Sequence, residues 1–353
     1  MFTRSRIAVT IALFATALAG CGNWPDQGGN ALWLIDASRD RAVLEYAANW
    51  SGWMIMPSSI WVAPLPAGDA SRFKEARVQA DLQADGDYYV AERPTDDGSR
   101  IVAGRFSTGD EWTLLRRDVR LEGRIFREVV LDGDRAAYRT PDGLSVYSLT
   151  QREILQTVPL SEPAVELLAV GGRYALISLD DRYSRYALVD LEDGTSDEPP
   201  TAPDGLHAMY YDAALSNAAL ITAAYREGGD GGASYAILIL DLPARTWRVL
   251  ADYGASPGGL TTSRTLAVLG ADQNVVLVSV IGLLGAQSLE LIDRATGERS
   301  AITAPLPSSP GCALLRAGQV YWVEQTPGVI RAFDVATRQI STYPADPPLT
   351  PLR

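Results

Sequence analysis

The chain has 353 residues, 31 basic and 43 acidic side chains, and a formal net charge of −12. An acidic surface disfavours nucleic acid as a partner, because phosphates repel it. A single histidine and two cysteines are too few for a zinc site, which takes several such ligands. The length is ample for a large hydrophobic core, and no low-complexity linker divides it, so residues 31–353 are predicted to form one domain.

Residues 1–20 have the pattern of a bacterial export signal. Arg4 and Arg6 supply its positive start, and Ile7–Ala19 is an apolar run too short for a comfortable membrane span. The sequence Leu18-Ala19-Gly20-Cys21 resembles the lipobox of bacterial lipoproteins. That resemblance implies cleavage before Cys21 and acylation of its thiol by fatty acids such as palmitate. An ordinary signal peptide with a coincidental cysteine is the alternative.

Residues 21–30 are predicted to be a flexible tether between the lipid and the domain. Gly22 follows the cysteine, and by the same resemblance this favours the outer membrane, with the protein on its periplasmic or surface side. Acylation of Cys21 leaves only Cys312, so no intrachain disulfide can form. Cys312 is expected in the first strand of the last repeat. We expect a monomer whose contact with the membrane runs through its lipid.

From residue 31 onward the chain repeats a short hairpin. The clearest copy, Leu289–Ala301, has an alternating strand that ends at an acid, a tight turn on Thr296-Gly297 and a returning strand. Alternation at every second residue excludes helical repeats of similar length. Equivalent positions recur every 40–50 residues or so, the period of four-stranded propeller blades. They are Pro64, Arg105, Ser148, Asp190, Asp241, Asp293 and Asp334.

The turn Ile292-Asp293-Arg294-Ala295-Thr296-Gly297 resembles the I-D-x-x-T-G turn of YVTN and WD40-like repeat propellers. The resemblance covers about residues 31–344 and implies an all-β fold, a seven-bladed β-propeller of four-stranded blades. Eight blades, one of them truncated, are the alternative. The resemblance speaks to fold rather than activity, because propellers host unrelated functions.

The first blade is expected to start after a spare strand, Leu32–Asp36. Because exposed sheet edges are a liability, we expect this strand to join the last blade beside Gln339–Tyr343 and close the ring as a strap. The predicted strands of the first blade are Val43–Ala47, Trp53–Met56, Ile60–Pro64 and Phe73–Val78. The later blades are predicted at about 87–120, 127–160, 165–198, 206–251, 259–303 and 312–344.

Blades five and six have the longest repeats. In blade five the excess is Ala224–Ser234, a Gly-rich stretch predicted as the loop between its second and third strands. In propellers such loops gather at the channel mouth, and loops held by a rigid scaffold often carry function. Arg and Tyr there suit recognition of a carboxylate or peptide, and a solvated charged rim is the alternative. The candidate binding residues of blades four and five are Asp180, Asp181, Arg182, Tyr183, Arg185, Tyr225, Arg226 and Glu227.

The residue types present give little support for a catalytic role. His207 would have to serve any serine-type triad, with Ser216 as a possible nucleophile, and no Gly-x-Ser-x-Gly elbow is present. No catalytic residue is therefore assigned. Calcium needs only oxygen ligands. The candidate pairs, which solvated turn acids would explain equally, are Asp85 with Asp87, Asp132 with Asp134, Asp96 with Asp97 and Asp180 with Asp181. We assign no cofactor.

The leading interpretation is a non-enzymatic binding or scaffold module for a protein or envelope component. The alternative is a calcium-dependent enzyme of the lactonase or lyase type. Carboxylates converging at the channel mouth would favour the enzyme, and exposed apolar loop residues such as Leu283 and Leu284 would favour the scaffold. The tryptophans Trp50, Trp53 and Trp61 could form a sugar-stacking platform or fill an interface between blades.

Overall fold

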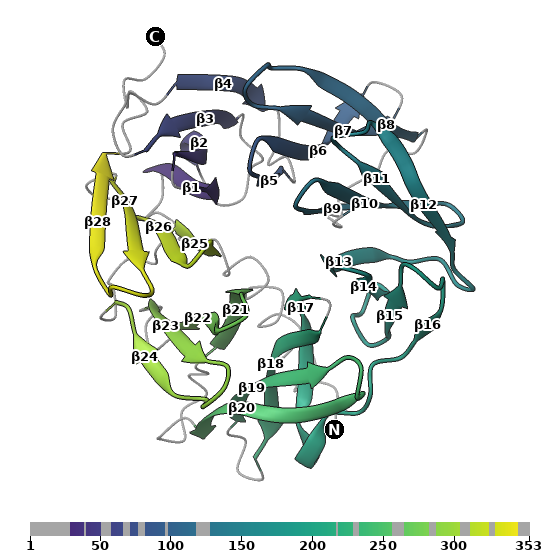
Figure 1. Cartoon of the computed structure of the whole chain (residues 1–353), viewed down its shortest axis with the longest axis vertical. Coiled ribbons are helices and arrows are strands. Elements are labelled where there is room, and N and C mark those ends of the chain that lie inside the picture. Colours follow the sequence, from purple (N-terminus) through teal and green to yellow (C-terminus); the bar gives the residue numbers. More distant parts are fainter. Residues whose placement is uncertain are drawn as a thin grey trace, which may run out of the picture.

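The computed structural model describes residues 29–38, 40–50, 58–65, 71–76, 82–95, 98–117, 128–216, 218–228, 233–255, 265–281, 287–303, 311–324 and 329–344. They form seven four-stranded sheets arranged radially around one axis (Figure 1). The seven-bladed β-propeller predicted from the repeat is confirmed, and the eight-bladed alternative is wrong. No helix in these residues is long and apolar enough to cross a membrane.

Every blade uses four consecutive antiparallel strands, which we name A to D from the axis outward. Blade one contains β1 (Gly29–Ala37), β2 (Arg41–Trp50), β3 (Ser58–Pro64) and β4 (Ser71–Ala76). Blade two contains β5 (Gln83–Asp85), β6 (Tyr88–Thr95), β7 (Gly98–Arg105) and β8 (Glu111–Arg117). Blade three contains β9 (Val129–Asp132), β10 (Arg135–Thr140), β11 (Gly143–Ser148) and β12 (Glu153–Pro159).

The remaining blades follow the same plan. Blade four contains β13 (Glu166–Gly171), β14 (Tyr174–Ser178), β15 (Tyr186–Asp190) and β16 (Ser196–Asp197), and the short 3-10 helix η1 (Pro203–Gly205) follows it. Blade five contains β17 (His207–Leu215), β18 (Ala219–Glu227), β19 (Ala233–Asp241) and β20 (Thr246–Ala255). Blade six contains β21 (Thr265–Ala271), β22 (Val275–Ile281), β23 (Gln287–Asp293) and β24 (Arg299–Ala301). Blade seven contains β25 (Gly311–Arg316), where Cys312 lies as predicted, β26 (Gln319–Glu324), β27 (Val329–Asp334) and β28 (Ile340–Pro344).

This plan gives the ring two distinct faces. Strand A begins each blade beside the axis, and successive strands alternate in direction. The B–C turns and the D–A connections therefore share one face, which we call the BC/DA face. The A–B and C–D turns share the opposite face, the AB/CD face.

The C–D turns show why the sequence repeat predicted the fold. In blade six the Asp293 carboxylate accepts hydrogen bonds from the backbone N–H groups of Ala295 and Thr296, at 2.9 and 2.8 Å. Gly297, four residues after the acid, has a φ of +75°, a conformation that favours glycine. These bonds lower the pKa of Asp293 below its usual value. The acid and the glycine are thus both required by one tight turn.

Apolar side chains fill the seams between neighbouring blades, so the core is a ring of interfaces rather than one central mass. At the seam of blades one and seven, Leu34 and Leu44 pack with Tyr321, Val323 and Ile330. Trp61 packs against the same cluster and donates its indole N–H to the Ser59 hydroxyl at 2.8 Å. The interface role that was one of two readings for the tryptophans therefore fits Trp61. Trp50 ends β2, and Trp53 lies outside the described residues.

The predicted closing strap is wrong. Leu32–Asp36 belongs to β1, where Leu32 is paired with Tyr46 of β2, and no strand of blade seven pairs with it within the described residues. The hairpin turns tightly, with the Ser38 N–H bonded to the Arg41 carbonyl at 2.8 Å. The predicted first blade was displaced by one strand, because Val43–Ala47 is strand B. Blades pack face to face, so closing the ring leaves no additional sheet edge for a strap to cover.

Side chains close the ring in place of a strap. Besides the apolar seam, the Arg316 Nε donates a hydrogen bond to Asp36 Oδ1 at 3.2 Å, joining the ends of β25 and β1. Asp36 is only 2% exposed. Burial raises the pKa of Asp36 to about 6, against the opposing effect of Arg316 and with a smaller contribution from Asp85. The closure therefore contains a buried carboxyl group that titrates near neutral pH.

Candidate binding face

The candidate residues divide between a loop and a strand. Asp180–Arg185 connects β14 to β15 in blade four, and this B–C loop lies where the sequence predicted it. The predicted loop Ala224–Ser234 of blade five is wrong at both ends. β18 continues to Glu227 and β19 begins at Ala233, with Arg226 paired to Ser234. Tyr225, Arg226 and Glu227 are therefore strand residues at the BC/DA end of blade five.

Two of the charged candidates hold the blade-four loop in shape. The Asp180 carboxylate accepts hydrogen bonds from the backbone N–H groups of Ser184 at 2.8 Å and Arg182 at 3.2 Å. Burial opposes ionisation of Asp180, but the Ser184 hydroxyl and the N–H donors outweigh it, so its pKa lies below the usual value. Arg185 makes two 2.9 Å contacts with the Glu162 carboxylate. Asp180 and Arg185 are thus occupied by structural contacts.

A layer of tyrosines underlies this loop at the seam of blades four and five. The rings of Tyr186 and Tyr210 are 4.5 Å apart between centroids. Tyr186 donates its hydroxyl to the Tyr183 carbonyl, and the Tyr183 hydroxyl bonds to Glu166. Burial raises the pKa of Tyr210 to about 12. The layer is therefore aromatic, and its rings are fixed by hydrogen bonds to one another and to Glu166.

Strand alternation separates the three candidates of blade five. Leu220 of β18 packs on Leu176 and Leu188 of blade four, whereas Ile221 of the same strand packs on blade six. Residues two apart on a strand share a face. Arg226, an even number of residues from Leu220, is directed towards blade four and the tyrosine layer. Tyr225 and Glu227 are directed towards blade six, so the eight candidates do not form one cluster.

Two arginines near the tyrosine layer differ from Arg185: Arg182, which precedes Tyr183 in the loop, and Arg226 at the end of β18. Arg182 and Arg226 are exposed, and neither has an ion-pair partner among the residues that the structure describes. An arginine with a free guanidinium beside aromatic rings can bind a carboxylate through two parallel hydrogen bonds. The arrangement therefore offers two cationic contacts over an apolar floor.

His207 lies at the start of β17, at the beginning of blade five, as the sequence predicted. Its ring is exposed and lies 5.2 Å from that of Tyr225 between centroids. Ser216 is at the opposite end of β17, in the A–B turn, where its hydroxyl donates to the Ala219 carbonyl at 3.2 Å. The two ends of β17 pair with Tyr225 and Leu220 of β18, about 17 Å apart along that strand, so His207 and Ser216 lie on opposite faces of the ring. They cannot exchange a proton.

The acid pairs proposed for calcium serve mainly as connections between blades. Asp132 accepts hydrogen bonds from the Gly172 N–H of blade four at 3.0 Å and from Arg135 at 2.7 Å. Asp85 accepts a bond from the Gly133 N–H of blade three at 3.2 Å. In the described parts of the chain, no group of three or more His, Cys, Asp or Glu side chains could hold a metal ion. Asp96, Asp97, Leu283 and Leu284 lie outside those parts.

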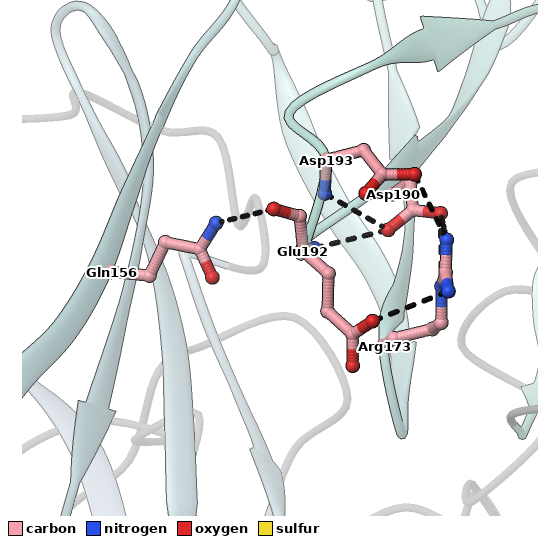
Figure 2. Close-up of polar contacts among 5 residues, drawn as sticks. All are labelled: Gln156, Arg173, Asp190, Glu192 and Asp193. Atoms are coloured by element: carbon pink, nitrogen blue, oxygen red, sulfur yellow. Dashed lines mark hydrogen bonds and ion pairs between the residues drawn. The ribbon is translucent and has the colours of Figure 1, made fainter.

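A cluster on the AB/CD face was missed by the sequence reasoning. Arg173, in the A–B turn of blade four, contacts the carboxylates of Asp190, Glu192 and Asp193, the last two at 3.2 and 3.1 Å (Figure 2). Gln156 of β12 donates to the Glu192 carbonyl at 3.2 Å and so ties blade three to this turn. The acid-rich turn Asp190–Asp193 was a visible signal, but its partner arginine is 17 residues earlier in the chain.

Arginines also replace glycine in alternate C–D turns. Gly109, Gly194 and Gly297 have positive φ in blades two, four and six, and Arg152, Arg245 and Arg338 have it in blades three, five and seven. The Arg152 guanidinium lies 4.3 Å from the centroid of Trp112 in blade two. Arg245 donates to the Glu198 carbonyl that follows blade four, at 3.0 Å. For Arg152 and Arg245, these contacts with the preceding blade offset the strain of the backbone.

No protein-family model matches the chain, and a search of curated proteins found no match either. Solved structures do resemble it. The β-propeller domain of the Trilobed protease from Pyrococcus furiosus, described as having an open velcro topology, aligns with a TM-score of 0.57 at 10% identity, over 91% of this chain and 98% of that one. An uncharacterized protein from Listeria monocytogenes aligns with a TM-score of 0.54 at 13% identity, over 90% and 95%.

The acylaminoacyl peptidase of Pyrococcus horikoshii aligns with a TM-score of 0.55 at 12% identity, over 88% of this chain but only 52% of the peptidase. At such identities these likenesses show the fold alone. The chain is a seven-bladed β-propeller whose blades are each built from consecutive strands.

Proposed function

We propose that this chain is a lipid-anchored propeller of the bacterial cell envelope. Its BC/DA face binds a protein or another envelope component without catalysing a reaction. The observation that carries the binding proposal is the pair of exposed arginines, Arg182 and Arg226, beside the hydrogen-bonded tyrosines of blades four and five. The lipobox at Cys21 supports the anchor. A ligand with a carboxylate, such as an acidic peptide segment, matches this surface best.

Fixed aromatic rings favour binding because little conformational entropy is lost when a ligand covers them. Tyr183 and Tyr186 are already held by hydrogen bonds to Glu166 and to each other. The arginines supply the polar contacts that such a floor lacks. The acidic net charge of the whole chain favours a partner with basic regions outside the contacted carboxylate.

The experiment is capture from an envelope extract by the immobilised mature protein. The double variant Arg182→Ala/Arg226→Ala should capture about one tenth as much of the partner as the wild type, or less. Each arginine at the centre of an interface contributes about 1 kcal/mol or more to the binding free energy. Arg116→Ala is the matched control, because Arg116 is also an exposed strand arginine, on blade two. Equal retention by the wild type and the double variant would contradict the proposed site. A peptide mass showing acyl chains on Cys21 tests the anchor separately.

A further inference from the structure

The position of the first strand restricts where a lipid anchor can lie. β1 is the strand of blade one nearest the axis (Figure 1). It begins at Gly29, and because successive strands alternate in direction, this end lies on the BC/DA face. Its other end is on the AB/CD face, because Asp36 contacts Arg316, which ends strand A of blade seven. The chain therefore enters the ring from the BC/DA face, beside the axis.

The segment between the lipobox cysteine and this entry point is short. Only seven residues, Gly22–Gly28, separate Cys21 from Gly29. At 3.3–3.6 Å per residue, the covalent chain from Cys21 to Gly29 spans at most about 26–29 Å. An acyl group on Cys21 must lie within that distance of the start of β1.

The opposite face is beyond the usual reach of this segment. A path around the rim crosses three strand spacings of about 4.8 Å and then follows β4, whose six residues span about 20 Å, so the whole path is close to 35 Å. A flexible segment of this length has a typical end-to-end distance of only about 16 Å. A path down the axis would thread an acylated residue through the ring, and chains essentially never thread in this way.

We infer that the anchor holds the BC/DA face towards the bilayer, so the partner of that face is a component held in the same membrane. This rests on the lipid anchor of the proposed function.

Energy transfer to labelled lipid headgroups tests the orientation. The acylated full-length mature protein is placed in phosphatidylethanolamine and phosphatidylglycerol vesicles, with one dye on a new cysteine in a Cys312→Ala background. Ser161→Cys labels the D–A connection after blade three, and Gln151→Cys labels the C–D turn of the same blade. Both positions are exposed and flank β12, a strand of seven residues, so the two dyes lie at opposite ends of this strand and on opposite faces of the ring.

Transfer from the Ser161 position should exceed transfer from the Gln151 position by roughly twofold, because Ser161 lies on the face held towards the labelled headgroups. Inserting about 20 Gly/Ser residues after Gly28 should remove most of the difference, because the lengthened tether reaches either face. This long-tether variant also keeps the test valid if one label weakens folding. Where Cys312→Ala does not fold, Cys312→Ser takes its place.

The possible results separate the two proposals. Protein that floats with the vesicles and transfers equally from both labels, or more from Gln151, overturns the orientation and leaves the anchor standing. Protein that does not float with the vesicles overturns the anchor itself, and the orientation with it. A twofold excess from Ser161 that the long tether abolishes supports both.

Discussion

The two faces of the ring use their charged residues differently. On the AB/CD face Arg173 contacts three carboxylates, Asp132 holds the backbone of the next blade, and Asp293 caps its own turn. On the BC/DA face Arg182 and Arg226 have no ion-pair partner within the described residues. Charges that already have partners stabilise a fold, and charges without them can bind a ligand. Asp180 and Arg185 also have structural contacts on the BC/DA face, so the comparison singles out Arg182 and Arg226 as the charges available there for the proposed recognition.

Gly297→Ala on the AB/CD face should give the largest loss of stability. A Cβ atom at Gly297 would lie 2.3 Å from the backbone carbonyl oxygen of Leu250, and the φ of +75° adds strain. We expect a loss of about 3–5 kcal/mol in the free energy of unfolding from the overlap and the strain together. Denaturant unfolding followed by circular dichroism measures it.

Gly109→Ala is the matched control for Gly297→Ala. Gly109 occupies the same C–D turn position in blade two, with a φ of +71° and nothing within 4 Å of an added Cβ. Gly109→Ala should lower the free energy of unfolding by about 1–2 kcal/mol, from the backbone strain alone. Equal losses for the two variants would show that the close contact between blades five and six at this turn does not affect the free energy of unfolding.

Asp36→Asn tests the closure of the ring. The pKa of Asp36 is raised from 3.8 to about 6 in the folded protein, so between these values the folded state binds more protons than the unfolded state. The contribution of Asp36 to stability is therefore full below about pH 4 and falls as the pH rises through about 6. The unfolding free energy of the wild type, relative to Asp36→Asn, should fall by up to about 3 kcal/mol between about pH 4 and pH 7.

Thermal unfolding of both proteins in parallel across that range provides the measurement. Subtracting the variant removes the contributions of the turn acids whose pKa values are lowered, such as Asp190 and Asp293. If the relative stability of the wild type rose with pH instead, Arg316 would outweigh burial at this site.

Arg173→Gln should produce a smaller loss. It leaves Asp190, Glu192 and Asp193 close together without their shared cation (Figure 2). The midpoint of thermal unfolding should fall, and high salt should reduce the difference from the wild type, because ions screen exposed charges. A difference that persists unchanged in about 1 M salt would mean that packing of the arginine stem, and not charge, stabilises the turn.

Arg182→Ala and Arg226→Ala should have the smallest effect on stability and the largest on binding. Neither side chain has an ion-pair partner to lose in the described structure, so the unfolding midpoint should stay within measurement error of the wild type. A clear destabilisation by either variant would place that arginine among the structural charges and end the distinction between the faces. Scanning calorimetry of the two single variants is sufficient.

The sequence predicted what depends on local chemistry. An acid followed four residues later by a glycine predicts a C–D turn, and Asp190 and Asp293 make the expected bonds. The same reasoning could not predict that Arg245 adopts positive φ after Asp241, because its side chain bonds to the Glu198 carbonyl, a contact that only the fold creates. It also treated Tyr225 and Arg226 as neighbours on a loop. Their opposite directions follow from the continuation of β18, which the Gly-rich stretch concealed.

The errors at the ring closure have one cause. The strap was expected because the two chain ends were treated as open sheet edges, yet a blade exposes its edges at the axis and the rim wherever it stands in the ring. The pairing of Asp36 with Arg316 spans 280 positions, and an acid near the end of a strand gives no sign of so distant a partner. Long-range side-chain contacts need the fold before they can be inferred.

Among the described residues no strand is exchanged between the first and last blades, and this has a genetic consequence. Each sheet is encoded by one uninterrupted stretch of the gene, from β1 to β4, β5 to β8 and so on around the ring. Unequal crossing-over within such a gene would duplicate or delete a complete sheet without leaving an unpaired strand. The blade number of descendants could then change in a single recombination event, with only the wedge angle between sheets left to readjust.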